Sequence, residues 1–506
     1  MEGLEASFYS ASQEQTLMPR RQFARLVGLL CALYALPVMA QTTPGEFTIA
    51  ALPDTQFYSK SYPQIFAAQT QWIADHAAEF NIQLVVGLGD IVDGGGEGYQ
   101  WQNADLAYRI LDGKVPYMVV IGNHDYDRNN PAGRTASTVN YNSYFGPNRY
   151  AGKSWYKGQY PSGSNENFYG VFTFGGKQYL ILMLEVFPRN SSLSWAAAVM
   201  KNHPGIDTIV VTHAYTYADS TRMDRCDENS AASMGVAQDN DGEQTWEKFT
   251  SKYSNITMVL NGHVVQGDGT GHRTDLGIYG NLVNQMLSDY QSWPNGGNGY
   301  FRLITVNPAT NQVVVKTYSP YLDRWLTDSH NQFILPYKNI GLSSGIAAIT
   351  GKLKDSSSCV GVGGARVSNG YGSATTDADG NFSLPAAGPK SYKLTVTRPG
   401  STTVAQASSL VPGHQTPGKI LLAKAGVFSG TVSFKLAPLA NAKVILTGGA
   451  LRINASTTTT SSGSFTFGSV PYGSYTVTVS IPGTTTTALY STMLGSTSKS
   501  MSLNLQ

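Results

Sequence analysis

The segment IQLVVGLGD, residues 82–90, is an apolar run that ends abruptly on glycine and aspartate. An unbroken apolar run of this length is expected of a strand that is covered on both faces. Four further segments share the pattern, and each ends on a polar side chain: FTIAALPD at Asp54, YMVVIGNHD at Asn123 and His124, DTIVVTH at His213 and ITMVLNGH at His263. The five segments predict the central strands of a layered domain.

Helical patterns lie between these predicted strands. Pro63 suits the first turn of a helix, and apolar residues then recur at helical spacing. Further helical patterns cover residues 103–111 and 192–203. The alternation of strands and helices predicts an α/β layered domain, which we place at residues 45–338.

A repeat follows the linker KNIGLSSGIAAIT, residues 338–350. Helical periodicity disappears there, and short strands separated by Gly and Asp turns begin. The two copies cover residues 345–424 and 425–506, and Phe382 of the first aligns with Phe465 of the second. The pattern predicts two all-β sandwich modules. On the segments TDADGNFSLP and GSFTFGSVPYGSYTVTV, the copies resemble carboxypeptidase regulatory-like (transthyretin-like) domains.

Charge is divided unevenly between these regions. Residues 341–506 contain 12 Lys and Arg against 3 Asp and Glu, a net charge of 12 − 3 = +9, whereas residues 41–340 contain 20 against 27, a net charge of 20 − 27 = −7. The basic modules are either spacers or a means of contacting a cell surface or polysaccharide. The negative first domain shows no interleaving of aromatic and basic residues, so we expect no nucleic-acid-binding module.

Polar side chains follow the predicted strands at one kind of position, the strand end. In an open α/β sheet such strand-end loops gather into one crevice. Each residue alone has a simpler explanation, such as a turn cap or a satisfied core histidine. Together, oxygen and imidazole donors without thiolate suit divalent Mn, Fe or Zn.

The motifs PDTQ, GDIVD, GNHD, VTH and GH occur in the order and spacing of the calcineurin-like metallophosphoesterases, which residues 47–335 resemble. The resemblance implies a four-layer αββα sandwich and two metal ions that share a hydroxide for in-line attack on phosphorus. It also implies the ligands. Asp90 bridges the metals, Asp54 holds the first metal, and the second metal takes Asn123, His213 and His263. His124 is then the non-ligand general acid, and Asp93 supports the site from behind.

Two positions depart from the family pattern. Gln56 replaces the histidine of the usual Asp-x-His motif, and Val265 replaces the second histidine of Gly-His-x-His. Both missing imidazoles belong to the first metal, so that site is either weak or empty, or another side chain substitutes. We rank the amide oxygen of Gln56 first, ahead of Asp268 and His272. The wording LPDTQFYS resembles an exported branch of the family in which Asp-x-Gln is common.

Residues 1–40 have the form of an N-terminal extension with an export signal. Arg20, Arg21 and Arg25 precede the apolar run LVGLLCALYALPV, which suits a Sec or twin-arginine signal. We therefore expect a periplasmic, extracellular or cell-surface protein without a transmembrane anchor in its mature form. Cys226 and Cys359 remain after cleavage, and because they fall in different regions we expect no disulfide framework.

The segment MDRCDENSAAS, residues 223–233, is a polar insertion after His213 that we expect to form a flexible rim over the site. The sequence thus predicts an exported metal-dependent hydrolase of phosphoric monoesters or diesters, with one or two metal ions. The alternative is a non-catalytic surface adhesion or carbohydrate-binding protein with a vestigial metal site.

Overall fold

The computed structural model describes residues 45–127, 137–236, 238–338, 347–386, 388, 391–398, 405–409, 418–449, 451 and 453–505. The predicted export signal, residues 1–40, lies outside these residues. Within the described ranges, no helix is long and apolar enough to cross a membrane.

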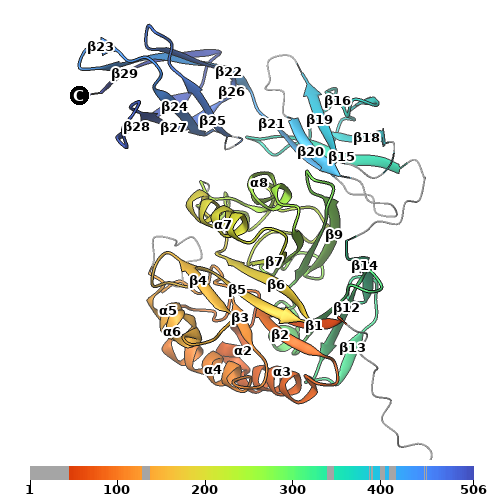
Figure 1. Ribbon diagram of the computed structural model, residues 1–506. Helices are drawn as coiled ribbons and strands as arrows, with labels where there is room; N and C mark the ends of the chain where they lie inside the picture. The colour runs from red at the N-terminus through yellow and green to blue at the C-terminus, as the bar shows by residue number, and fades with distance from the viewer. Residues whose placement is uncertain are drawn as a thin grey trace, which may run out of the picture. The chain divides into compact units, whose positions relative to one another are not determined.

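The first domain contains two seven-stranded mixed sheets (Figure 1). The first sheet has the order β13-β12-β11-β1-β2-β3, with β14 paired to β12. Its strands are β1 (Phe47–Leu52), β2 (Ile82–Gly87), β3 (Tyr117–Val119), β11 (Phe301–Asn307), β12 (Gln312–Ser319), β13 (Arg324–Leu326) and β14 (Phe333–Pro336). The strands β1, β2 and β3 are parallel, so their carboxyl ends meet at one edge.

The second sheet has the order β4-β5-β6-β7-β8-β10-β9. Its strands are β4 (Tyr156–Tyr160), β5 (Asn167–Phe174), β6 (Lys177–Leu184), β7 (Asp207–Thr212), β8 (Ile256–Asn261), β9 (Thr270–Leu276) and β10 (Leu282–Ser288). Its four central strands, β6, β7, β8 and β10, are parallel, and they present a second set of carboxyl ends.

Helices pack against the outer faces of the two sheets (Figure 1). They are α2 (Gln56–Ser61), α3 (Pro63–His76), α4 (Gly98–Arg109), α5 (Val139–Phe145), α6 (Pro147–Tyr150), α7 (Asn190–Asn202), α8 (Gly242–Lys248) and α9 (Pro294–Gly297), with a 3-10 turn at Thr250–Lys252. The three predicted helices are present. The second of them begins at Gly98 instead of near residue 103.

The alternation of side chains along β6 shows how the layers are held together. Leu180, Leu182 and Leu184 belong to the core that also contains apolar residues of α7, whereas Ile181 and Met183 belong to the core shared with the first sheet. Successive side chains of a strand point to opposite faces, so β6 lies between a helical layer and another sheet. The αββα sandwich predicted for this domain is confirmed.

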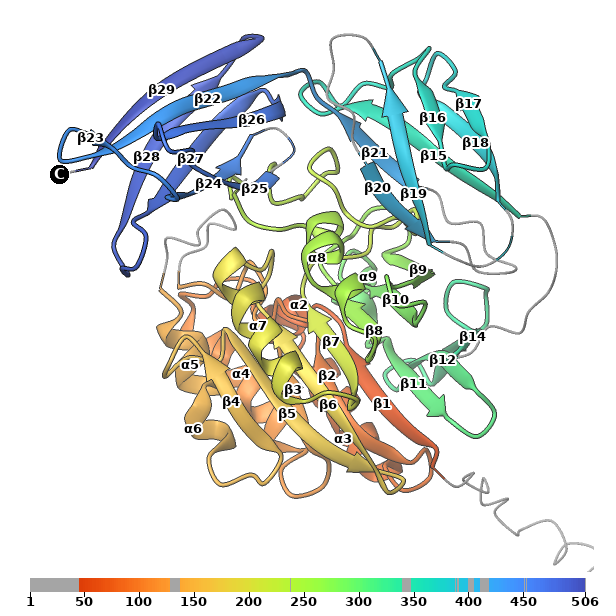
Figure 2. The same cartoon turned by 45° about the horizontal axis from the view of Figure 1, so that its top comes forward.

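The C-terminal region consists of two further units, each built from two small sheets (Figure 2). The first unit contains β15 (Ala347–Asp355), β18 (Asn381–Ala386) and β21 (Gly418–Leu422) in one sheet, and β16 (Arg366–Ser368), β17 (Ser373–Thr375), β19 (Ser391–Thr397) and β20 (Ala405–Ser409) in the other. Phe382, which the repeat aligns with Phe465, is buried in its core.

The second unit repeats this arrangement. One sheet contains β22 (Ala425–Phe434), β23 (Ala437–Pro438), β26 (Ser464–Pro471) and β29 (Ser498–Leu505), and the other contains β24 (Lys443–Gly448), β25 (Ile453–Thr458), β27 (Gly473–Ser480) and β28 (Thr487–Leu494). Phe465 occupies the same place in this core as Phe382 in the first. The prediction of two all-β sandwiches is confirmed.

A disulfide bond joins Cys226 to Cys359, across 133 residues of sequence. We expected no disulfide framework because the two cysteines fall in different regions, yet they form this bond, because distance along the sequence does not limit which surfaces fold together. Nearby, the buried ammonium of Lys419 lies 2.9 Å from both carboxylate oxygens of Asp227. A covalent bond and an ion pair thus connect the insertion after β7 to the first β-sandwich.

Candidate metal centre

The site residues predicted from strand ends come from both sheets. Asp54 follows β1, Asp90 follows β2, His213 directly follows β7, and His263 follows β8. Asn123 follows β3. All five side chains are buried. The carboxyl ends of the parallel strands in the two sheets therefore deliver oxygen and imidazole donors into the interior, away from water.

Three of these residues have a strained backbone. The φ angles of Asp54, Asp90 and His263 are +24°, +45° and +76°. Residues other than glycine rarely adopt such angles, and each instance costs on the order of 1–3 kcal/mol. Such strain persists only where the surrounding fold holds the residue in place, and strained residues cluster at functional sites. Three strained strand ends around one point therefore indicate a functional site.

The centre of the site is formed by Asp90, His213 and His263, whose donor atoms lie within 4.8 Å of one another. Nε2 of His213 lies 3.2 Å from Oδ2 of Asp90 and 3.0 Å from Oδ1 of Asn123. Carboxylate, amide and imidazole donors converging on one point make a mixed ligand set that a borderline divalent metal prefers.

Each imidazole at the site is oriented by a backbone carbonyl. Nδ1 of His213 donates to the carbonyl of Leu88 at 2.7 Å, and Nε2 of His263 donates to that of Asn229 at 2.8 Å. A carbonyl only accepts hydrogen bonds, so these nitrogens carry the protons. The opposite nitrogens, Nε2 of His213 and Nδ1 of His263, then keep the lone pairs that a metal requires.

His124 lies beside this cluster and is held in the same way. Its Nδ1 donates to the backbone carbonyl of Asp93 at 2.8 Å, and its backbone N–H donates to Oδ1 of Asp90 at 2.9 Å. Burial acts to lower the pKa of His124, but the charges of Asp90 and Asp93 and the hydrogen bond to the Asp93 carbonyl together outweigh it, and the pKa is raised above its usual value. The imidazole therefore favours the protonated form that a general acid needs.

Comparison with known proteins agrees with this arrangement. Residues 47–267 match the family model of calcineurin-like phosphoesterases. The chain carries a calcineurin-like phosphoesterase domain. Residues 348–422 and 427–506 match the carboxypeptidase regulatory-like domain, in agreement with the predicted repeats.

Individual relatives extend the comparison. The chain is 33% identical over 288 residues to the uncharacterized protein YvnB of Bacillus subtilis (strain 168), a match that covers 54% of this chain and 20% of that protein. The chain thus spans about a fifth of the length of this relative.

Two solved structures also align. One is purple acid phosphatase PPD1 from yellow lupin (Lupinus luteus) seeds, with 13% identity, a TM-score of 0.38, and 59% of this chain and 55% of that chain covered. The other is TT1561 of Thermus thermophilus, with 11% identity, a TM-score of 0.28, and 56% and 98% covered.

The half of the phosphoesterase site that departs from the family pattern contains unsatisfied oxygen atoms. Oδ1 of Asp54 accepts a hydrogen bond from the backbone N–H of His263 at 3.0 Å. Oδ2 of Asp54 and Oε1 of Gln56 are buried and have no hydrogen-bond partner among the described residues. Buried polar atoms are almost always paired, so oxygens left open in this way fit a bound cation.

The lower-ranked substitutes for the missing histidines are engaged elsewhere. Asp268 accepts hydrogen bonds from Thr270 and lies 2.7 Å from Nδ1 of His330. The ring of His272 stacks on Phe333, with 4.0 Å between centroids. Gln56, whose Oε1 is buried and unpaired two residues after Asp54, is the substitute that these contacts favour.

Asp93 supports the phosphoesterase site from its edge. Its Oδ2 lies 2.6 Å from Nζ of Lys60, and its Oδ1 lies 4.0 Å from Nδ1 of His124. The carboxylate is thus neutralised by the lysine while the Asp93 carbonyl orients the histidine. This geometry suits a positioning residue instead of one that exchanges a proton with substrate.

Sequence reasoning missed two buried carboxylates near the site. Asp125, in the motif GNHD, accepts hydrogen bonds from the backbone N–H groups of Gly122 and Val92, and so fastens the loop after β3 to the loop after β2. Asp289, directly after β10, is fully buried. The segment VNQMLSD also ends on a polar side chain directly after a strand, as the other predicted strands do. Polar residues within β10 interrupt its apolar run, so the strand was not recognised.

The insertion at residues 223–233 differs from the flexible rim that we expected. Met223, Ser230 and Ala231 are buried, and the Asn229 carbonyl holds His263. The segment is therefore packed against the site and supplies part of its support.

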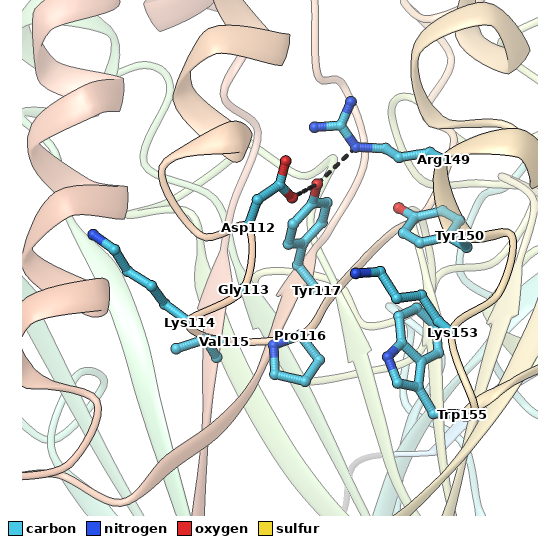
Figure 3. Close-up of a pocket in the computed structure, with 10 residues that line it drawn as sticks. All are labelled: Asp112, Gly113, Lys114, Val115, Pro116, Tyr117, Arg149, Tyr150, Lys153 and Trp155. Atoms are coloured by element: carbon cyan, nitrogen blue, oxygen red, sulfur yellow. Dashed lines mark hydrogen bonds between the residues drawn. The ribbon is translucent and has the colours of Figure 1, made fainter.

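A pocket elsewhere in the domain is separate from this site. It is lined in part by Asp112, Arg149 and Tyr117, whose hydroxyl donates to Asp112 and accepts from Arg149 (Figure 3). Tyr117 is the first residue of β3, whereas Asn123 and His124 follow the end of that strand. The pocket therefore opens at the opposite end of β3 from the metal-site residues.

Proposed function

We propose that the chain is an exported, metal-dependent hydrolase of phosphoric monoesters or diesters. The observation that carries this proposal is the cluster of Asp90, His213 and His263, with His124 hydrogen-bonded to the same aspartate. A cluster of ligands next to an oriented imidazole is the combination that ester hydrolysis at phosphorus requires.

The metal ligands divide into two sets that share Asp90. Asn123, His213 and His263 would hold the second metal with Asp90, while Asp54 and Gln56 would hold the first. The donors suit one or two ions of Mn, Fe or Zn. Such ions, when bound, lower the pKa of a coordinated water and polarise the phosphoryl oxygens.

The remaining steps belong to side chains of this domain. His124 is the general acid, and its Nε2 delivers a proton to the oxygen of the leaving alcohol because Nδ1 is held by the Asp93 carbonyl. Asp93, paired with Lys60, keeps that carbonyl in place. Burial of the ligands excludes bulk water, which strengthens each electrostatic contact with the phosphoryl group.

Export rests on two features of the chain. Arg20, Arg21 and Arg25 precede an apolar run, in the part of the chain outside the described residues. The disulfide between Cys226 and Cys359 supports the same conclusion, because disulfides persist in oxidising compartments outside the cytosol. The basic β-sandwich modules then contact a cell surface or polysaccharide, or act as spacers.

The test is hydrolysis of an aryl phosphate monoester and a bis-aryl phosphate by the purified full chain, with Mn, Fe or Zn supplied in turn. We expect turnover of at least one substrate and its loss in His124→Ala. His203→Ala is the matched control, since the His203 imidazole bonds to the Val199 carbonyl at the end of α7 and packs against the Tyr169 ring, and His203 is not among the proposed site residues. Absence of turnover with every metal, together with binding of the modules to polysaccharide, would support the adhesion protein instead.

A further inference from the structure

The ring of Phe187 packs directly on the imidazole of His263. The two ring centroids lie 5.5 Å apart, and the ring planes are nearly perpendicular, at 87°. The same imidazole contacts the ring of His213, with 4.9 Å between centroids and 65° between planes. Aromatic rings favour such T-shaped contacts. The imidazole of His263 is therefore in contact with two other rings inside the domain.

The hydrogen bond to the Asn229 carbonyl does not by itself fix the plane of the His263 imidazole. It holds Nε2, which lies nearer the axis of the Cβ–Cγ bond than Nδ1 does. Rotation about that bond therefore displaces Nδ1 further than Nε2, and the torsion itself is broad for histidine. Since Nδ1 carries the lone pair for a metal, the neighbouring rings decide where that lone pair points.

Phe187 adopts a backbone conformation that phenylalanine rarely has. Its φ is +46°, in the left-handed region, where a bulky side chain is an outlier. Its side chain is only 1% exposed. A phenylalanine fills a core without such strain, so the strained conformation indicates that the fold requires this ring at one particular place.

The loop that contains Phe187 is closed by an ion pair between its two ends. Glu185, directly after β6, is fully buried, and its two carboxylate oxygens lie 3.0 Å and 2.6 Å from Nε and a terminal nitrogen of Arg189. The backbone N–H of Glu185 donates to Oδ1 of Asn167 at 3.0 Å, and its carbonyl accepts from the Thr212 hydroxyl at 3.1 Å. The start of the loop is thus fixed to the sheet.

The residue after Phe187 is held as well. The carbonyl of Pro188 accepts hydrogen bonds from the side-chain and backbone N–H groups of Asn240, at 2.7 Å and 3.3 Å. Asn240 is itself fully buried. Strained residues persist only where the surrounding structure fixes them, and here both neighbours of the strained residue are anchored.

We propose that Phe187 is a positioning residue of the metal centre, whose ring fixes the plane of the His263 imidazole so that Nδ1 points at the second metal position. This inference rests on the proposed function, since it concerns a ligand of the same centre. Phe187 has no donor atom of its own and acts through His263. A ligand that is already oriented binds a metal more tightly, because little ordering remains to be done on binding.

The first experiment is Co²⁺ titration of the metal-stripped full chain, followed by calorimetry and by visible absorption, which reports the geometry around bound Co²⁺. Phe187→Leu keeps an apolar side chain but removes the ring. We expect this variant to bind the Co²⁺ held by His263 roughly 10–100-fold more weakly than the wild type, with a changed absorption spectrum.

Phe249→Leu is the matched control. Phe249 is also 1% exposed, and its ring packs against that of Tyr253 in the core between the second sheet and its helices. Both substitutions remove a ring from an equally buried position, so both are expected to lower the thermal midpoint of the metal-free chain. Only Phe187→Leu is expected to change the affinity for Co²⁺ and the absorption spectrum.

A second measurement needs no metal. The chain has 8 histidines, so ¹⁵N-histidine labelling gives few imidazole signals in magnetic resonance spectra, and His263→Gln identifies those of His263. In the wild type we expect one sharp set, with the proton on Nε2. In Phe187→Leu we expect these signals to broaden or shift, because the imidazole is free to rotate. Phe187→Met is the second variant if Phe187→Leu does not fold.

Unchanged Co²⁺ affinity, absorption and His263 signals in Phe187→Leu would overturn the positioning role and leave the proposed function intact. An equal loss of Co²⁺ affinity in Phe249→Leu would also overturn it, because the effect would then follow from stability alone. Absence of Co²⁺ binding by the wild type would contradict the proposed function itself, and this inference with it.

Discussion

His124 illustrates how much of the chemistry depends on one hydrogen bond. Because the Asp93 carbonyl fixes Nδ1, only Nε2 is able to transfer a proton to the leaving group. General acid catalysis contributes more when the leaving alcohol is a poor one. A single substitution of His124 therefore distinguishes proton donation from a role in folding or in metal binding.

We expect His124→Ala to lower kcat by about 10²–10⁴-fold for an alkyl phosphate ester and by much less for a nitrophenyl ester, whose leaving group needs little protonation. Steady-state rates with the two esters measure this difference. Metal content is expected to stay unchanged, since His124 is not among the ligands. Equal losses for both esters would contradict the assignment of His124 as the acid.

At the scale of single residues, the sequence predicted candidate site residues where a strand holds at least three consecutive apolar residues. Asp54, Asp90 and His213 each follow such a run, namely residues 49–52, 84–86 and 209–211. Asp289 was not predicted, because Asn284 and Gln285 interrupt β10 and hide its strand character. Both polar residues are buried and satisfied: Asn284 donates to the Pro336 carbonyl, and Gln285 to Asp275.

Among the elements, helix α4 shows why boundaries are harder to predict than the elements themselves. Apolar periodicity predicted a helix near residue 103, but the helix begins at Gly98. Its first turn is held by contacts with the loop after β2. Trp101 donates to the Gly95 carbonyl, and the side chain of Gln100 accepts from the backbone N–H of Asp93. Such tertiary contacts leave no periodic trace in the sequence.

The two sheets are connected at Asp207, the first residue of β7, which is the middle strand of its sheet. Its carboxylate lies 2.5 Å from Nζ of both Lys177 and Lys338, and it accepts from the Tyr337 hydroxyl at 2.7 Å. Lys177 begins β6, and Tyr337 follows β14 of the other sheet. Burial acts to raise the pKa of Asp207, but the two lysines outweigh it and hold the pKa below its usual value.

We expect Asp207→Asn to lower the free energy of unfolding by about 1–2 kcal/mol at pH 7, as the lysines are partly exposed. A depressed folded-state pKa stabilises above the unfolded value of about 3.9, and the effect is lost as the pH falls toward the folded-state pKa. The difference between variant and wild type should therefore shrink below about pH 4 in urea unfolding. Asp75→Asn, on the exposed face of α3, is the control. If the difference in unfolding free energy between Asp207→Asn and the wild type became larger in acid, this account would be contradicted.

At the scale of the whole molecule, the sequence predicted the order of the domains but not the bond between them. The repeat made both β-sandwiches visible, since each copy carries the same turn and core residues. Cys226 and Cys359 gave no such sign, because each lies alone in its region. The disulfide joins the first sandwich to the insertion whose Asn229 carbonyl orients His263, so it connects a module to the metal centre.

We expect Cys359→Ser to lower the thermal midpoint of the full chain, with a loss of about 2–4 kcal/mol in the free energy of unfolding. Reductant should lower the wild-type midpoint similarly and leave the variant unchanged. Affinity for the second metal is expected to fall as well, because the Asn229 segment loses an anchor. If reductant left the thermal midpoint of the wild type unchanged, the disulfide would not stabilise the connection between these regions.

The central claim, a metal-dependent phosphoesterase centred on Asp90, is tested most directly by reconstitution. The full chain is stripped with chelator, supplied with Mn²⁺, and assayed with bis-aryl and aryl monophosphate esters beside Asp90→Asn. We predict that hydrolysis of at least one ester disappears on stripping and returns with metal in the wild type, while Asp90→Asn stays inactive. Hydrolysis that survives stripping, or that Asp90→Asn retains at the wild-type rate, would contradict the claim.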